Sequence, residues 1–243
     1  MNEFGTALLL AMLPAAGNFL GGVVSEFIRV SQKVLSIALH VAAGIIMAVI
    51  AVELMPQALA ASRPWIPILT FVLGGLFFVV IDQMLDIVKS RIGSPDAQSG
   101  PWAVFFGVAV DLFSDGVMIG AGSTLSFGLG LLLALGQVPA DIPEGFATIA
   151  NFKRQGIARS RRLLLSASFA IPILLGTAIG YFAVRGQPEI YKLGLLAFTA
   201  GILFTVTIEE IVPEAHKDGE ARLAAFALVG GFALFALLAT YFD

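Results

Sequence analysis

The sequence predicts an all-α protein that crosses a membrane several times. Its 243 residues are 58% hydrophobic and only 13% charged, and the mean hydropathy is +0.93. Soluble domains carry about 25% charged residues, so this composition excludes a soluble or a disordered chain. The net charge of −3 gives no indication of nucleic-acid binding. Because the chain has no cysteine, a disulfide framework, a thiolate metal site and a catalytic thiol are excluded.

Eight segments have the length and composition of membrane-spanning helices, which need about 20 mainly apolar residues. Their connections are short, so we expect residues 1–243 to form a single transmembrane domain. No Lys or Arg precedes the first apolar run, which is therefore expected to be a retained helix rather than a signal peptide. The predicted segments are 5–27, 34–60, 65–88, 102–122, 125–150, 163–184, 190–213 and 221–242.

Lys and Arg residues are distributed unevenly between the two sides of this arrangement. The connections after segments one, three, five and seven hold 11 of the 14 basic residues. Short cytoplasmic loops of membrane proteins are enriched in Lys and Arg. The sequence therefore predicts that these four loops lie in the cytoplasm and that both termini lie outside.

Two of the predicted helices share an internal repeat. Residues 43–59 (AGIIMAVIAVELMPQAL) align with residues 200–216 (AGILFTVTIEEIVPEAH) with seven identities in 17 positions. In the predicted topology these helices run in opposite directions. Inverted repeats are typical of transporters that bind their substrate near the middle of the bilayer, although gene duplication also produces repeats in other membrane proteins.

Four carboxyl groups lie within the fourth and fifth segments: Asp111 and Asp115 in one, Asp141 and Glu144 in the other. An acidic residue at the centre of a membrane helix costs about 2.5–3.5 kcal/mol, and neither segment contains Lys or Arg. The i, i+4 and i, i+3 spacings place each pair on one face of its helix. We therefore expect either a site for a cation, which displaces protons on binding, or protonated carboxyls that neighbouring helices satisfy.

Three strings resemble the signature segments of the ZIP (Zrt-, Irt-like protein) metal-ion transporters: DLFSDGVMIG at 111–120, ADIPEGFA at 140–147 and EIVPEAH at 210–216. The resemblance implies eight membrane helices, with helices 1–3 related to helices 6–8 by an inverted repeat around helices 4 and 5. It also implies transport of divalent transition-metal ions toward the cytoplasm through a site on helices 4 and 5. The implied protein is a transporter and not an enzyme.

The family motif is carried over only in part. Asp115, Asp141 and Glu144 match its acids, whereas Asp111 stands where most members have His. Met47 lies where some members place a thioether ligand.

Three further positions depart from the family pattern. Leu112 replaces the family's Asn, Ala140 replaces a His, and Ile171 stands where many members carry an acid in helix 6. The departures predict one metal site, or a weakened second one. Because oxygen ligands suit harder ions than imidazole does, iron or manganese is an alternative to zinc, the family's usual substrate.

Four further residues are predicted to lie along the transport pathway or, equally, at solvated helix ends: Glu53, Glu210, Glu214 and His216. The metal ion (Zn, or Fe, Mn or Cd) is expected to be the substrate, with no organic cofactor. The expected surroundings are membrane lipid in a prokaryotic cytoplasmic membrane, and a homodimer is left open. Two other functions use the same carboxylates: a proton- or sodium-coupled carrier, and a metal-binding membrane sensor.

Overall fold

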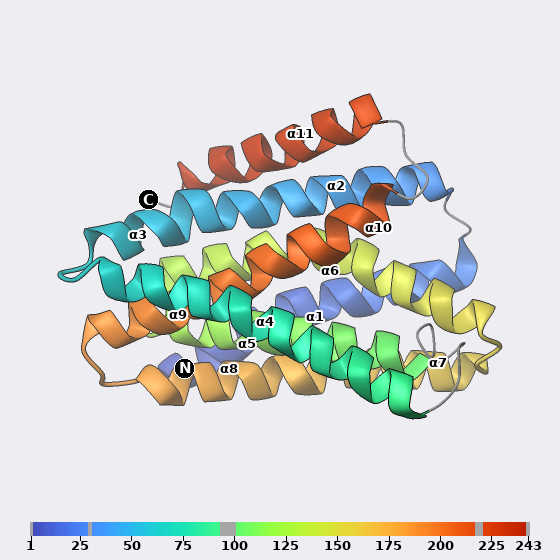
Figure 1. Ribbon diagram of the computed structural model, residues 1–243, viewed down its shortest axis with the longest axis horizontal. Coiled ribbons are helices and arrows are strands. Elements are labelled where there is room, and N and C mark those ends of the chain that lie inside the picture. The colour runs from blue at the N-terminus through green and yellow to red at the C-terminus, as the bar shows by residue number, and fades with distance from the viewer. Residues whose placement is uncertain (1, 29–30, 93–100, 217–220, 242–243) are drawn as a thin grey trace.

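The computed structural model describes residues 2–28, 31–92, 101–216 and 221–241, and within these ranges the chain forms helices and no strands (Figure 1). Side chains cap several helix starts: Asn2 accepts a hydrogen bond from the Gly5 amide, and Ser126 accepts one from Leu129. The helices are α1 Glu3–Phe27, α2 Gln32–Ala48, η1 Val49–Leu54, α3 Met55–Ala60, α4 Trp65–Ile92, α5 Pro101–Ser123, α6 Phe127–Arg154, α7 Arg159–Ser168, α8 Ala170–Val184, α9 Glu189–Val206, η3 Thr207–Ile211, α10 Val212–His216 and α11 Ala221–Ala239.

Each predicted segment coincides with one helix or with a run of consecutive helices, and the ends differ by a few residues. In the described part of the chain, five stretches are long and apolar enough to cross a membrane, and two shorter apolar helices accompany them. The 28-residue α6 is not among the five, and it carries the polar residues described below. The five stretches are Glu3–Phe27, Lys33–Ala60, Val104–Ser123, Arg159–Val184 and Glu189–Glu209.

The long helices pack in two groups. In one group α1 packs mainly against α6, α5 packs against α8, and α5 contacts α6. In the other group α4 packs against α9, and α2 packs against α11. Contacts of α2 with α6 and of α5 with α9 join the two groups. All four carboxyl-bearing positions on α5 and α6 therefore belong to the first group.

The two repeat segments share an unusual backbone feature. Each contains a π-helical turn, Val49–Leu54 in one and Thr207–Ile211 in the other, and a proline follows each turn (Pro56 and Pro213). A proline lacks the amide hydrogen that an α-helix needs, and π-helical turns within α-helices occur frequently at functional sites. The α2–η1–α3 and α9–η3–α10 runs point in opposite directions in Figure 1.

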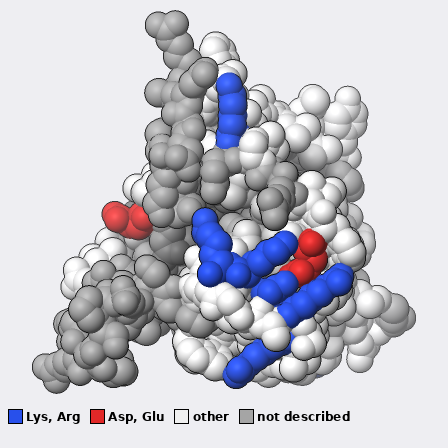
Figure 2. Space-filling view, turned by 90° about the vertical axis from the view of Figure 1, so that its right-hand side faces the viewer, with Lys and Arg blue, Asp and Glu red and all other residues white. Residues whose placement is uncertain are grey.

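The first and last helices reach the same end of the molecule: α1 begins and α11 ends at the left of Figure 1. Lys and Arg side chains gather at the opposite end, which faces the viewer in Figure 2. The connection between α6 and α7 supplies many of them. The basic residues of this connection and its flanks are Lys153, Arg154, Arg159, Arg161 and Arg162.

Candidate metal site between α5 and α6

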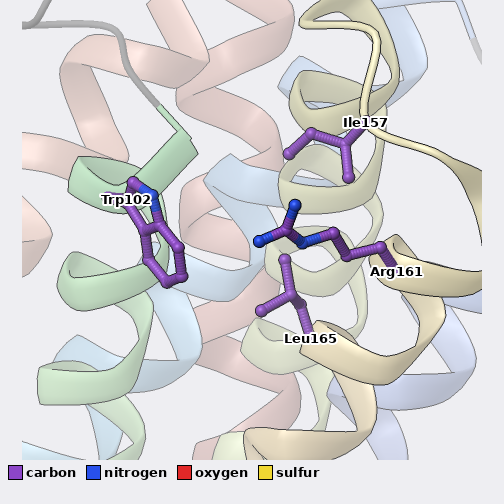
Figure 3. A pocket seen from close by; sticks show the side chains of 4 residues that line it. All are labelled: Trp102, Ile157, Arg161 and Leu165. Atoms are coloured by element: carbon purple, nitrogen blue, oxygen red, sulfur yellow. The ribbon is translucent and has the colours of Figure 1, made fainter.

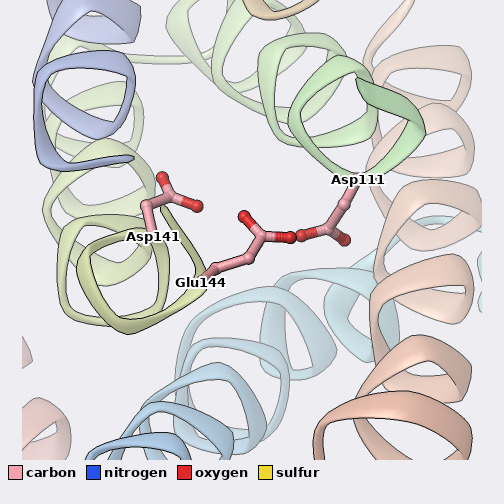
Figure 4. A group of neighbouring side chains, drawn as sticks. All are labelled: Asp111, Asp141 and Glu144. Carbon is pink, nitrogen blue, oxygen red and sulfur yellow. The ribbon is translucent and has the colours of Figure 1, made fainter. Parts of the chain in front are cut away.

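Three carboxylates from α5 and α6 converge on one another. One carboxylate oxygen from each of Asp111, Asp141 and Glu144 lies within 4.8 Å of the other two. Asp141 is buried and 1% exposed, and the other two are half-buried. The three side chains converge in Figure 4, with Asp111 on α5 and the other two on α6. Oxygen ligands lie about 2.0–2.2 Å from zinc, so small side-chain adjustments bring all three around one ion.

A fourth polar side chain reaches this group from α1. Asn18 is 0% exposed, and its Nδ2 donates a hydrogen bond to Glu144 Oε2 at 3.0 Å. Asn18 Oδ1 and Asp141 Oδ2 are buried and have no hydrogen-bond partner among the described residues. Buried polar atoms are nearly always paired, so two such oxygens beside converging carboxylates indicate a place for a positively charged ligand.

Close backbone packing fixes α1 against α6 at this level. A Cβ atom added to Gly145 would lie 1.9 Å from the backbone oxygen of Asn18, and one added to Gly21 would lie 1.9 Å from that of Ile142. Both positions therefore require glycine. The contact holds the Asn18 side chain beside the residues that follow Asp141 on α6.

Asp115 has a different environment from the other three acids. It is 2% exposed, and its Oδ1 accepts a hydrogen bond from Gln137 Nε2 at 2.6 Å. The group of converging oxygens contains Asp111, one helical turn away on α5, and not Asp115. The structure thus brings three of the four predicted acids together and joins the fourth to a neutral amide of α6.

The three converging carboxylates form a hard, all-oxygen ligand set. Ions with a hydration shell are expensive to move into a membrane interior unless charged groups replace the water. Three carboxylates and a nearby amide supply both charge and oxygen atoms for a divalent ion. The neighbouring positions Leu112 and Ala140 are buried and provide no ligand atom.

Asn18 and Gln137 are not among the site residues predicted from the sequence. Gln137 belongs to a stripe of polar residues along one face of α6, at spacings of four and three residues. That periodicity is a sequence signal that could have identified it. Asn18 stands alone in the apolar run of α1 and gives only the weaker signal of an isolated amide in a membrane helix. The stripe consists of Gln137, Asp141, Glu144, Thr148, Asn151 and Gln155.

The other predicted residues lie elsewhere. Met47 is half-buried on α2, next to the start of η1. Glu53 lies within η1, is 7% exposed and accepts a hydrogen bond from Gln57. The side chains of Glu210, Glu214 and His216 fall outside the part that the structure describes. Their backbone belongs to η3 and α10.

The position of His40 near the start of the second predicted helix favours an interfacial side chain, but this prediction is wrong, because His40 is buried and 1% exposed. Its Nδ1 lies 2.8 Å from the Ser36 backbone oxygen, and Ser36 in turn donates to the backbone oxygen of Ala215 at 2.5 Å. Packing of α10 against α2 explains the burial.

A small pocket lies at the basic end of the molecule, away from the carboxylates. Its volume is about 100 Å³, and Trp102, Ile157, Arg161 and Leu165 line it (Figure 3). None of the described residues that line this pocket is acidic.

Comparison with known proteins identifies relatives over nearly the whole chain. A family model described as "ZIP Zinc transporter" matches residues 97–239. Zinc transporter ZupT of Chlorobium phaeovibrioides is 28% identical, with 98% of both chains covered. Zinc transporter ZupT of Shigella dysenteriae is 25% identical over 93% of both chains. Human zinc transporter ZIP10 is 29% identical over 58% of this chain and 18% of its own length.

Proposed function

Because the chain belongs to the ZIP family of zinc transporters, we propose that it carries divalent transition-metal ions across the membrane toward the cytoplasm. It is an integral membrane protein and a transporter, not an enzyme. Residues 1–243 act as a single transport domain. The observation that carries the proposal is the convergence of Asp111, Asp141 and Glu144 within 4.8 Å of one another.

The ion is held by the three converging carboxylates in the middle of the membrane. Asp115 supports the site without being one of these three ligands. Its hydrogen bond with Gln137 holds α5 against α6. Met47 supplies a softer thioether donor from α2. Binding displaces protons from the carboxyls, and reprotonation on the cytoplasmic side helps to release the ion.

Zinc is the expected substrate, since the relatives are named as zinc transporters. The carboxylate ligands also suit Fe²⁺, Mn²⁺ and Cd²⁺, and no imidazole at the site favours zinc over them. We propose a single ion per chain, because two positions at which many family members have polar residues are apolar here. These are Leu112 and Ile171, and Ile171, on α8, is 59% exposed.

The transport domain is proposed to consist of eight membrane helices that include an inverted repeat. The repeat is supported by the two π-helical turns and by the pairing of the helices. If α1 is exchanged with α8, α2 with α9, α4 with α11 and α5 with α6, the α1–α6 contact becomes the α5–α8 contact. The same exchange interchanges the α4–α9 and α2–α11 contacts. All the converging acids lie in one helix group, so motion of that group against the other exposes the ion to each side in turn.

The cytoplasmic side is the basic end of Figure 2, which places both termini outside. The polar stripe of α6 supports release of the ion at the basic end. From Glu144 it continues through Thr148 and Asn151 toward Lys153 and Arg154. Glu53 lies on the outer part of the pathway, and Glu210, Glu214 and His216 lie on the cytoplasmic part.

Uptake by the purified protein in liposomes tests the proposal. We expect the wild type to take up a transition metal and both Asp141→Asn and Glu144→Gln to lose that uptake. Glu189→Gln, the same chemical change at an exposed position in the first turn of α9, serves as the matched control and retains uptake. Normal uptake in both site variants would contradict the proposal. Flux driven by pH without any metal would favour a proton-coupled carrier, and metal binding without flux would favour a sensor.

A further inference from the structure

Asn18 is the only described residue of α1 with a side-chain hydrogen bond to a converging carboxylate. It lies 126 positions from Glu144 in the sequence. None of the strings that resemble the family motif includes it.

We propose that the side-chain oxygen of Asn18 is a neutral ligand of the transported ion, and that it shifts the site toward harder divalent ions. The proposal rests on the transport function proposed above and adds a ligand from α1 to those from the other helices. The amide nitrogen of Asn18 is occupied by Glu144, and the amide oxygen remains for the ion.

The position of the amide supports ligation. Asn18 is 0% exposed, so water does not reach it from the surface. Because the oxygen and nitrogen of an amide share one carbon atom, Oδ1 lies beside Glu144 as well. That oxygen and Asp141 Oδ2 are both buried, and neither has a hydrogen-bond partner among the described residues. A single cation between them would satisfy both.

The backbone keeps Asn18 in place. Gly145 has no side chain, and its Cα faces the backbone oxygen of Asn18. Any larger residue would separate α1 from α6. The backbone of Asn18 is therefore held against α6 at the level of the converging carboxylates.

The charge balance favours an amide at this position. Three carboxylates already exceed the charge of a divalent ion, so a further ligand need not be charged. A neutral amide oxygen adds a ligand atom without adding charge. Amide and carboxylate oxygens are the ligand types that suit Mn²⁺ and Mg²⁺ better than they suit soft ions.

The test measures uptake of Zn²⁺ and Mn²⁺ against metal concentration in liposomes. It compares the wild type with Asn18→Ala, Asn18→Asp and a control, Ser25→Ala. Ser25 is 4% exposed and lies two turns further along the same face of α1. We expect Asn18→Ala to raise the KM for Mn²⁺ by about 10-fold or more, with a smaller effect on Zn²⁺, and Ser25→Ala to resemble the wild type.

The variant Asn18→Asp distinguishes a role of Asn18 as a ligand of the ion from a role in positioning Glu144. Aspartate keeps the oxygen but loses the N–H group that donates to Glu144. If the oxygen binds the ion, Asn18→Asp has a lower KM than Asn18→Ala. If Asn18 acts only by holding Glu144, Asn18→Asp is as poor as Asn18→Ala or poorer, and the proposal is overturned.

The two proposals fail in different ways. Loss of uptake in Glu144→Gln together with an unchanged KM and metal ranking in Asn18→Ala would overturn the role of Asn18 alone. Uptake that persists in Glu144→Gln would overturn the transport site itself. If Asn18→Ala does not fold, as judged by gel filtration and thermal unfolding, Asn18→Asp is compared with the wild type alone: a ratio of the KM values for Mn²⁺ and Zn²⁺ close to that of the wild type supports ligation, and a ratio shifted toward Zn²⁺ overturns it.

Discussion

Gln137 Nε2 donates a hydrogen bond to Asp115 Oδ1 at 2.6 Å, and both side chains are 2% exposed. The bond joins α6 to α5 one helical turn from the converging carboxylates. Hydrogen bonds to charged or strongly polar partners are short and strong when buried. The pair therefore fixes the relative position of the two helices that carry Asp111, Asp141 and Glu144.

Replacing Gln137 by Leu is expected to destabilise the protein more than removing both partners. Gln137→Leu leaves the Asp115 carboxyl buried without this donor, a loss of about 1–3 kcal/mol. The double variant Asp115→Leu/Gln137→Leu leaves no polar group there and loses less. Thermal unfolding in detergent measures both, and a double variant that is less stable than Gln137→Leu would show that the bond is not what the pair contributes.

Gly145→Ala is expected to disrupt the packing of α1 on α6. The added Cβ would lie 1.9 Å from the Asn18 backbone oxygen, closer than atoms can approach, so the helices must move apart. Gly107→Ala on α5 is the matched control, because a Cβ there meets nothing within 4 Å. We expect a clearly lower midpoint of thermal unfolding and lost uptake for Gly145→Ala only. Equal behaviour of the two variants would contradict the close contact.

Much of the fold follows from hydropathy. Apolar runs of helical length predicted where helices lie, and Asn2 and Ser126 mark two helix starts by capping. The two π-helical turns were not predicted, because apolar periodicity does not record whether a helix widens locally. Burial of His40 was not predicted either, since it depends on α10, which is distant in the sequence, packing against α2.

Three features of the sequence predicted the candidate site: helix periodicity, four acids in apolar segments without basic residues, and the resemblance to the ZIP signature strings. The i, i+3 spacing of Asp141 and Glu144 placed both on one face of α6, and both converge with Asp111. Spacing could not distinguish Asp111 from Asp115, because their environments depend on which residue of α6 faces each of them. Asn18 could not be assigned, because its contact with Glu144 joins helices that are far apart in the chain.

The ion pair between Glu26 and Arg162 is expected to stabilise the basic end of the molecule. Glu26 accepts two hydrogen bonds from Arg162, at 2.6 and 2.7 Å, and the side chains are 3% and 10% exposed. Arg162→Met leaves a buried carboxylate with one fewer partner, a loss of about 1.5–3 kcal/mol. The neighbouring Arg161 is exposed and has no hydrogen bond or ion pair among the described residues, so Arg161→Met serves as the control.

Thermal unfolding of the purified variants measures this difference. We expect Arg162→Met to unfold at a clearly lower temperature than the wild type, and Arg161→Met to unfold close to it. Adding the exchange Glu26→Arg/Arg162→Glu tests the pairing directly, because it restores opposite charges and should recover part of the loss. Equal unfolding temperatures for Arg162→Met and Arg161→Met would mean that the pair contributes little.

Metal binding at equilibrium is expected to distinguish the two acids of α5. Asp111 converges with Asp141 and Glu144, whereas Asp115 is bonded to Gln137. We expect one Mn²⁺ or Zn²⁺ per wild-type chain, measured by equilibrium dialysis with elemental analysis. Asp111→Asn removes a charged ligand and weakens binding, by about 10-fold or more. Asp115→Asn keeps an oxygen that accepts from Gln137, so the stoichiometry stays at one and the affinity changes less. Similar losses in both variants would mean that Asp115 also binds the ion, and two ions per wild-type chain would mean that a second site forms without ligands from Leu112 or Ile171.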